Sequence, residues 1–177
     1  MAYFFTSDEH FGHKNIIKYC NRPFSSVEEM DETLIDNFNS KISDDDVTVH
    51  LGDFCLYKSV NRVETNYIDR LNGEHIFIMG SHDKWLSNLN PKSIFECQID
   101  NTYIVGCHYL MKIWPLSHYG SWLLFGHSHG ASNNLIEGKQ HDVGVDNNNY
   151  YPLSFNEIKE IMSSKPDNLN LANKIFD

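Results

Sequence analysis

The chain has 177 residues, of which 41% are hydrophobic and 13% aromatic, a composition typical of a folded globular protein rather than a disordered one. Its formal net charge of -10 argues against an extended nucleic acid as partner, because nucleic-acid-binding domains usually present a basic surface. The length favours a single domain over residues 1–177.

The first half of the chain alternates predicted strands and helices. Short apolar runs predict strands at residues 2–6, 47–51 and 75–79. Between them, apolar positions three and four apart predict helices within residues 25–42 and 58–73, and Ser26 with Glu29 forms a candidate capping box for the first helix. This order favours right-handed crossovers and a parallel sheet.

The second half consists mostly of predicted strands. They lie at residues 94–99, 102–108, 122–125 and 141–145. A last helix is expected at residues 154–162, with Ser154 and Glu157 as its capping box. These strands favour antiparallel or mixed pairing, so we expect a second sheet.

The cysteines and the apolar segments favour a cytoplasmic setting. The four cysteines form no C-x-x-C pair, which argues against a disulfide framework or a cysteine-bound zinc ion. The N-terminal residues lack the basic region of a signal peptide, and no apolar run approaches transmembrane length. We expect no membrane partner, and nothing in the sequence specifies an oligomeric state.

Acidic and imidazole side chains follow five of the predicted strands. The segments "DEH", "GD", "GSHD", "HY" and "GHSH" each come directly after an apolar run. Because ligands bind at the carboxyl ends of strands in α/β sheets, we expect these segments to converge. In extended chain, Asp8 and His10 would point to one side, and so would His127 and His129.

A shared cation is the natural partner of such a cluster. Asp and His without a thiolate suit Mn, Fe, Zn, Co or Ni better than calcium or a soft ion. A single histidine on a strand is usually a hydrogen-bonded structural residue, and we interpret His50 and His75 in this way. We place His118 and His141 at the surface or behind the site. The conjunction of five segments in this order is much more specific than any one of them.

The five segments resemble the ordered motifs of the calcineurin-like metallophosphoesterase superfamily, which are D-x-H, G-D, G-N-H-D/E, a lone H and G-H-x-H. They span residues 8–129, and "VGVDNNNYYPLSF" is similar to the closing strand and loop of small bacterial and phage members. The resemblance implies an α/β protein with a four-layer α-β-β-α sandwich, two mixed sheets and a two-metal site at one edge. It also implies a bacterial cell or a phage-infected host as the setting.

The resemblance also implies roles for individual residues. One metal would be held by Asp8, His10 and His129. The second would be held by His108 and His127, with Asp53 bridging the two. His82 would be the catalytic histidine and protonate the leaving alkoxide, and Asp83 would orient and polarise it.

One motif departs from the family pattern, because Ser81 stands where the family has an asparagine ligand. A neutral hydroxyl is a shorter and weaker ligand than an amide carbonyl. Ser81 would therefore ligate weakly, act through a water, or leave the second metal loosely held. A serine introduced to weaken the site is a further alternative that the sequence leaves open.

The implied activity is metal-dependent hydrolysis of a phosphomonoester or a phosphodiester, such as a nucleotide or another small molecule, with two divalent metal ions as cofactors. Manganese is the first expectation, with Fe, Zn, Ni or Co as alternatives. Candidate substrate contacts just after the first motif are His13, Asn15 and Arg22, and the segment "WPLSHYGSW" is a candidate aromatic rim.

Two other functions remain open at this point. A chain of this fold that has lost its metals would serve as a scaffold or protein-interaction module, and Ser81 is the feature that favours this alternative. Against it, six of the seven expected ligand positions and His82 are intact. A nuclease of the same superfamily is disfavoured by the short length and the acidic charge.

Overall fold

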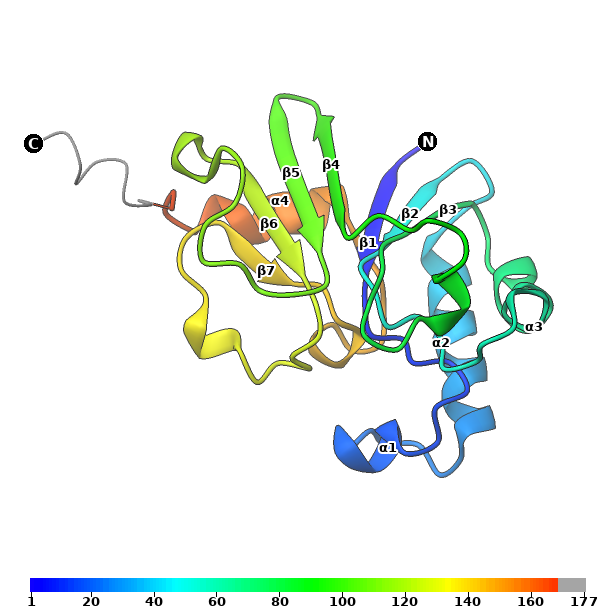
Figure 1. Cartoon of the computed structure of the whole chain (residues 1–177). Helices are drawn as coiled ribbons and strands as arrows, with labels where there is room; N and C mark the ends of the chain where they lie inside the picture. The colour runs from blue at the N-terminus through cyan, green and yellow to red at the C-terminus, as the bar shows by residue number, and fades with distance from the viewer. Residues whose placement is uncertain (169–177) are drawn as a thin grey trace, which may run out of the picture.

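The structure is a computed structural model that describes residues 1–168 (Figure 1). Within these residues, two four-stranded sheets form the centre of the molecule. The first has the order β3-β2-β1-β8, with the strands β1 Tyr3–Thr6, β2 Val47–His50, β3 Glu74–Phe77 and β8 Leu153–Ser154. The second has the order β4-β5-β6-β7, with the strands β4 Ile94–Ile99, β5 Thr102–Cys107, β6 Trp122–Phe125 and β7 Gln140–Asp142.

Both sheets are mixed, as the resemblance implies, whereas the strand and helix order alone predicts a parallel first sheet. In the first sheet β1, β2 and β3 run parallel, and only β8 pairs antiparallel with β1. In the second sheet β5, β6 and β7 run parallel, and β4 pairs antiparallel with β5. The predicted fold class, α/β with two mixed sheets, is confirmed.

The buried strands are apolar on both faces because each sheet is covered on both sides. Phe5 of β1 packs between the sheets with Ile104 and Leu124 of the second sheet. Its neighbour Phe4 points the other way, toward Leu34 of the helix that covers the first sheet. On the far side of the second sheet, side chains of β5 and β6 pack against loop residues of segments 109–121 and 131–139.

The helices are α1 Ile16–Tyr19, α2 Val27–Lys41, α3 Val60–Asn66 and α4 Phe155–Ser163. The hydroxyl of Ser26 caps α2 by accepting a hydrogen bond from the backbone of Glu29 at 3.1 Å. The predicted capping box of α4 is complete, since the side chains of Ser154 and Glu157 each bond the other's backbone. Figure 1 shows α2 over the first sheet and α4 beside the second.

Three elements differ from the sequence prediction. The helix expected at 58–73 is α3 followed by a 3-10 turn at Ile68–Arg70, because Tyr67 leaves helical geometry to stack on Phe11 and bond Asp31. The strand expected at 141–145 ends at Asp142. The outer layer over the second sheet consists of loops and short 3-10 turns at Ser117–Tyr119 and Asn133–Leu135 rather than a long helix.

Of the helices in residues 1–168, none is long and apolar enough to cross a membrane. The four cysteines, which all lie in this part of the chain, are free thiols. The part of the fold that matters for function is the edge where the strands of both sheets end.

Candidate metal centre

The loops that follow β1, β2, β3, β5 and β6 converge at one edge of the sandwich. Their backbone leaves the strands in an unusual conformation, since five residues there have a positive φ: Asp8, His10, Asp53, His127 and His129. Such strain is costly for residues other than glycine and is concentrated at functional sites. The structure also corrects the geometry expected from sequence, because Asp8, His10, His127 and His129 have positive φ values and do not lie in extended chain.

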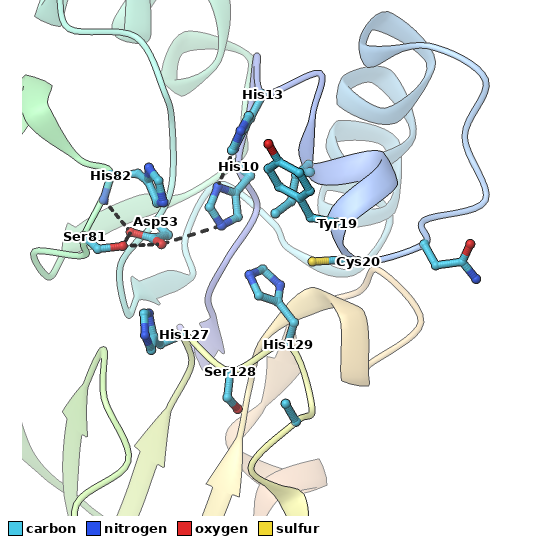
Figure 2. A pocket seen from close by; sticks show the side chains of 13 residues that line it. His10, His13, Tyr19, Cys20, Asp53, Ser81, His82, His127, Ser128 and His129 are labelled. Carbon is cyan, nitrogen blue, oxygen red and sulfur yellow. Dashed lines mark hydrogen bonds and ion pairs between the residues drawn. The ribbon is translucent and has the colours of Figure 1, made fainter.

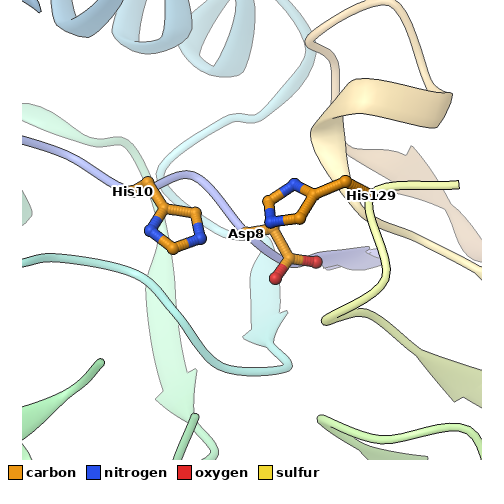
Figure 3. A group of neighbouring side chains, drawn as sticks. All are labelled: Asp8, His10 and His129. Atoms are coloured by element: carbon orange, nitrogen blue, oxygen red, sulfur yellow. The ribbon is translucent and has the colours of Figure 1, made fainter. Parts of the chain in front are cut away.

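A first group of ligand atoms comes from Asp8, His10 and His129, which lie within 4.8 Å of one another (Figure 3). Asp8 and His10 are buried, and the rings of His10 and His129 stack with centroids 5.2 Å apart. Two segments that are far apart in sequence, the loops after β1 and β6, thus form this group.

A second group comes from Asp53, His108 and His127, whose ligand atoms also lie within 4.8 Å of one another. Nε2 of His108 is 3.3 Å from the Asp53 carboxylate and 3.2 Å from Nδ1 of His127. Asp53 also lies 3.6 Å from Nε2 of His10, so its carboxylate stands between the two groups. The histidines of "GHSH" therefore lie in different groups, as the resemblance implies.

The burial of Asp8 and His10 in the first group fits a divalent cation. Burial raises the pKa of Asp8 to about 7 and lowers the pKa of His10 far below its ordinary value, so the imidazole stays neutral. Within residues 1–168, Nε2 of His10 is buried without a hydrogen-bond partner. Neutral imidazoles and carboxylates without a thiolate are the ligand set of Mn, Fe, Zn, Co or Ni. A cation would supply the positive charge that these buried groups lack.

Two glycines allow the loops to approach this closely. A Cβ on Gly80 would lie 2.1 Å from the backbone nitrogen of Asp53, and one on Gly126 would lie 2.4 Å from the Asp8 carboxylate. The same close approach lets the backbone N–H of His127 donate to Asp8 at 2.8 Å. Any side chain at either glycine would push the ligand loops apart.

Asp83 holds two of the loops together and is buried. Its carboxylate accepts backbone hydrogen bonds from Asp53 at 2.7 Å, Phe54 at 2.9 Å and Gly80 at 3.0 Å. It also accepts from the backbone of Cys55 and from the Trp85 indole, both at 3.2 Å. The resemblance implies that Asp83 polarises His82, whereas these contacts favour a positioning role for the loops that carry Asp53 and His82.

Ser81 and His82 follow directly on that loop and both bond Asp53. The Ser81 hydroxyl donates to the two Asp53 oxygens at 3.2 and 3.0 Å, and the backbone N–H of His82 donates to Oδ1 at 2.8 Å. The His82 ring lies 5.2 Å from the ring of His10 and 5.6 Å from that of His13, measured between centroids. His82 is therefore placed beside both groups, facing the same space.

This space is an open pocket of about 790 Å³ (Figure 2). His10, Asp53, Ser81, His82, His127 and His129 line it on one side, and α1 forms the facing wall with Tyr19 and Cys20. The expected aromatic rim "WPLSHYGSW" contributes none of the lining residues, and among those described Tyr19 provides a phenol ring. Tyr19 is 74% exposed.

The three candidate substrate contacts have different places. His13 lines the pocket, and its Nδ1 lies 3.1 Å from Nδ1 of His10. Asn15 is exposed at the start of α1 and is not part of the pocket wall. Arg22 is buried, 4% exposed, and bonds the carboxylate of Asp146 with two nitrogens, so it cannot serve as the expected substrate contact.

Sequence reasoning missed two features near the site. Asp146 contacts His129, and its signal was available because it follows the predicted strand 141–145 as the other site residues follow theirs. Glu9, between Asp8 and His10, is buried and lies 2.7 Å from Nδ1 of His50, which in turn bonds His75. The structural interpretation of His50 and His75 is consistent with this chain of contacts.

Comparisons with known proteins place the chain among uncharacterized relatives. No family model matches it. It is 37% identical over 167 residues to the uncharacterized protein MJ1445 of Methanocaldococcus jannaschii, covering 88% of each chain. Its fold is similar to that of the protein of unknown function AQ665 from Aquifex aeolicus, with a TM-score of 0.70, 23% identity, and coverage of 90% of this chain and 98% of that one.

Two further likenesses are weaker. A novel archaeal phosphodiesterase is 18% identical with a TM-score of 0.41, over 73% of this chain and 74% of that one. Vps29 from Entamoeba histolytica, as a single mutant, is 16% identical with a TM-score of 0.44, over 73% of this chain and 65% of that one. Both are too distant to bear on the chemistry of this pocket.

Proposed function

We propose, from the premise that the chain belongs to the same family as the uncharacterized protein MJ1445 and has the calcineurin-like metallophosphoesterase fold, that it is a metal-dependent phosphoester hydrolase. One observation carries the proposal. Two groups of Asp and His ligand atoms share one open pocket, with the Asp53 carboxylate between them and His82 beside them.

The residues present would hold two divalent cations. Asp8, His10 and His129 would bind the first, His108 and His127 the second, and Asp53 would contact both. Bound cations would supply an activated water as nucleophile and neutralise the phosphate oxygens during an in-line displacement. Manganese is the first candidate, with Fe, Zn, Ni or Co as alternatives.

The chain's own residues would do the rest of the chemistry. The imidazole of His82 lines the pocket and would donate a proton to the leaving alkoxide, which breaks away from phosphorus as the attacking oxygen bonds to it. Asp83 would hold the loop that carries His82 against the loop that carries Asp53, through the backbone hydrogen bonds described above. General acid catalysis of this kind contributes about 10²–10⁴-fold in rate.

The pocket favours a small phosphoester whose phosphate carries an organic substituent, such as a nucleotide. None of the residues that line it in the described part of the chain is a lysine or arginine, so the phosphate charge would be met by the cations and histidines alone. The opposite wall offers the apolar side chain of Ile16 and the exposed ring of Tyr19 to the remainder of the substrate. Both phosphomonoesters and phosphodiesters fit this description.

The test is hydrolysis of p-nitrophenyl phosphate, bis-p-nitrophenyl phosphate and a panel of nucleotides, each with and without Mn²⁺. We expect Mn²⁺-dependent turnover that falls by about 10²–10⁴-fold in His82→Ala, with Mn²⁺ binding unchanged. His118→Ala is the matched control, because His118 is an exposed histidine outside the pocket and its loss should leave turnover unchanged.

Two outcomes would overturn parts of the proposal. Full activity in His82→Ala would remove the assigned role of His82. A wild-type chain that neither binds Mn²⁺ nor hydrolyses any member of the panel would contradict the hydrolase and favour the scaffold instead.

A further inference from the structure

A carboxylate that the proposed chemistry does not use lies against His129. Oδ2 of Asp146 is 2.6 Å from Nδ1 of His129, and the Asp146 side chain is only 8% exposed. Asp146 belongs to the short turn Val145–Asn147 that follows β7, so it reaches His129 from a different segment. The contact leaves Nε2 as the nitrogen with which His129 can face Asp8 and His10.

Arg22 holds this carboxylate from behind. Its Nε and Nη2 donate to the two oxygens of Asp146, both at 2.8 Å. The same guanidinium donates to the backbone carbonyls of Asp8 at 2.7 Å and Glu9 at 2.9 Å. Arg22 therefore connects Asp146 to the loop that carries Asp8.

This arrangement also decides which ligand set is available to a cation. The side chains of Cys20, His129 and Asp146 form another group whose ligand atoms lie within 4.8 Å of one another. Arg22 occupies both oxygens of Asp146 and places a positive charge beside them, which disfavours a cation at that group. The carboxylate is thus directed to the imidazole of His129 instead.

We propose that Asp146, held by Arg22, is a positioning residue for His129 and sets the affinity of the first cation group, Asp8, His10 and His129. A carboxylate behind a ligating imidazole fixes its ring orientation and tautomer and raises its basicity. The inference rests on the proposed function, because it takes the first group as a cation site. It assigns Arg22 to the support of the site rather than to the substrate.

The first test is Mn²⁺ titration of the metal-free protein by calorimetry, comparing wild type with Asp146→Asn. The substitution removes the negative charge but keeps the size of the side chain. We expect one of the two Mn²⁺ sites to weaken by about 10–100-fold, the usual effect of losing such a partner. The other site should change by less than about twofold, since Asp53, His108 and His127 do not contact Asp146.

Asp142→Asn is the matched control. Asp142 is a buried carboxylate in the same segment, and it supports the same loop by accepting from the Ser128 hydroxyl at 3.0 Å and the backbone of Gly130 at 3.3 Å. It supports the loop through these atoms rather than through the His129 ring. Equal weakening of the same site by both substitutions would show general loosening of the loop and overturn the inference.

A double-mutant cycle separates the contact from any effect on folding. Once His129 is replaced by alanine, adding Asp146→Asn should change the remaining Mn²⁺ affinity by less than about twofold. If the two substitutions lower the Mn²⁺ affinity additively, the inference is wrong. It is also wrong if Asp146→Asn alone keeps the wild-type affinity.

If Asp146→Asn does not fold, Arg22→Lys provides the same test. Lysine keeps the positive charge but loses the two-point bond to Asp146, so this substitution should weaken the same site. A wild-type chain without Mn²⁺ binding would instead contradict the proposed function.

Discussion

Ser81 is the position at which the site differs from the pattern it resembles, and the structure shows what the serine does. Its hydroxyl donates to both oxygens of Asp53, the carboxylate that stands between the two ligand groups. A hydroxyl that donates to a ligand competes with a cation for the same lone pairs. Ser81 is exposed at the pocket wall, so a longer side chain can be accommodated there.

Replacing Ser81 by asparagine should therefore strengthen the second cation group. The amide carbonyl provides an oxygen ligand, and Asp53 loses the competing hydroxyl. We expect Mn²⁺ to bind this group about tenfold more tightly, with higher turnover at limiting Mn²⁺, and calorimetry with steady-state kinetics measures both. Ser87→Asn, at an exposed position outside the pocket, is the control. Unchanged affinity would mean that serine, or a water beside it, already fills the position adequately.

At the scale of elements, the site depends on loops held in register by buried carboxylates. Asp83 joins the loop after β2 to the loop after β3, and Asp142 supports the loop after β6. These loops carry residues in strained backbone conformations, including Asp53 at φ 58° and His127 at φ 71°. The strained conformations persist because the surrounding hydrogen bonds hold the loops in place.

Replacing Asp83 by asparagine should loosen two of these loops together. The amide nitrogen would face backbone N–H donors, so at least one of them loses its partner. We expect the free energy of unfolding to fall by about 2 kcal/mol, as for a lost bond to a buried charged group, and Mn²⁺ binding to weaken as well. Denaturant unfolding and calorimetry measure these changes, with exposed Asp100→Asn as the control. A variant as stable as wild type would show that Asp83 does not hold the loops.

At the scale of the whole molecule, several buried or half-buried histidines lie away from the cation groups. Burial lowers the pKa of His50 to about 3 and that of His75 to about 4. Burial, and then the nearby charge of Lys165, lowers the pKa of His141 to about 4. In the unfolded chain these imidazoles take up a proton near pH 6.5. Between these values each of these histidines binds a proton more readily in the unfolded state, so its contribution favours unfolding in acid.

In the metal-free protein, each of these histidines should therefore contribute stability that is lost as the pH falls from about 6.5 to 4. Each such histidine contributes a slope of up to about 1.4 kcal/mol per pH unit in that window. His141→Asn should give a smaller slope than wild type, whatever its absolute stability, when the free energy of unfolding is measured across the range. Ser87→Asn, which replaces an exposed side chain that does not titrate, is the control and should keep the wild-type slope. Identical slopes in His141→Asn and wild type would contradict the prediction.

Much of the fold and of the candidate site could be predicted because the relevant signals are local. Strands β1, β2 and β6 are buried on both faces, so they appear in the sequence as short apolar runs. Asp8, Asp53 and His127 follow such runs directly, and this position indicates convergence at one sheet edge without knowledge of the contacts. The helix cap at Ser26 and the capping box at Ser154 are likewise evident from neighbouring residues, although the Glu29 carboxylate bonds Ser25 and does not complete the box expected at Ser26.

The contacts that were missed all join residues far apart in the chain. Arg22 looks like a solvent or substrate charge in the sequence, and only the fold brings it to Asp146, which lies 124 residues away. Likewise, the end of α3 depends on Tyr67 reaching Asp31, a contact that no local propensity encodes.

The sequence by itself determined which residue types form the site, their order, and the strand ends at which they lie. This is possible because hydrophobic periodicity, strand burial and turn chemistry each depend on a few neighbouring residues. The tertiary structure decided which histidine shares a group with which carboxylate, that Arg22 supports the site while Tyr19 faces the pocket, and that Asp146 stands behind His129. These are outcomes of long-range packing between two sheets. They depend on the relative positions of loops, which no single segment of the chain specifies.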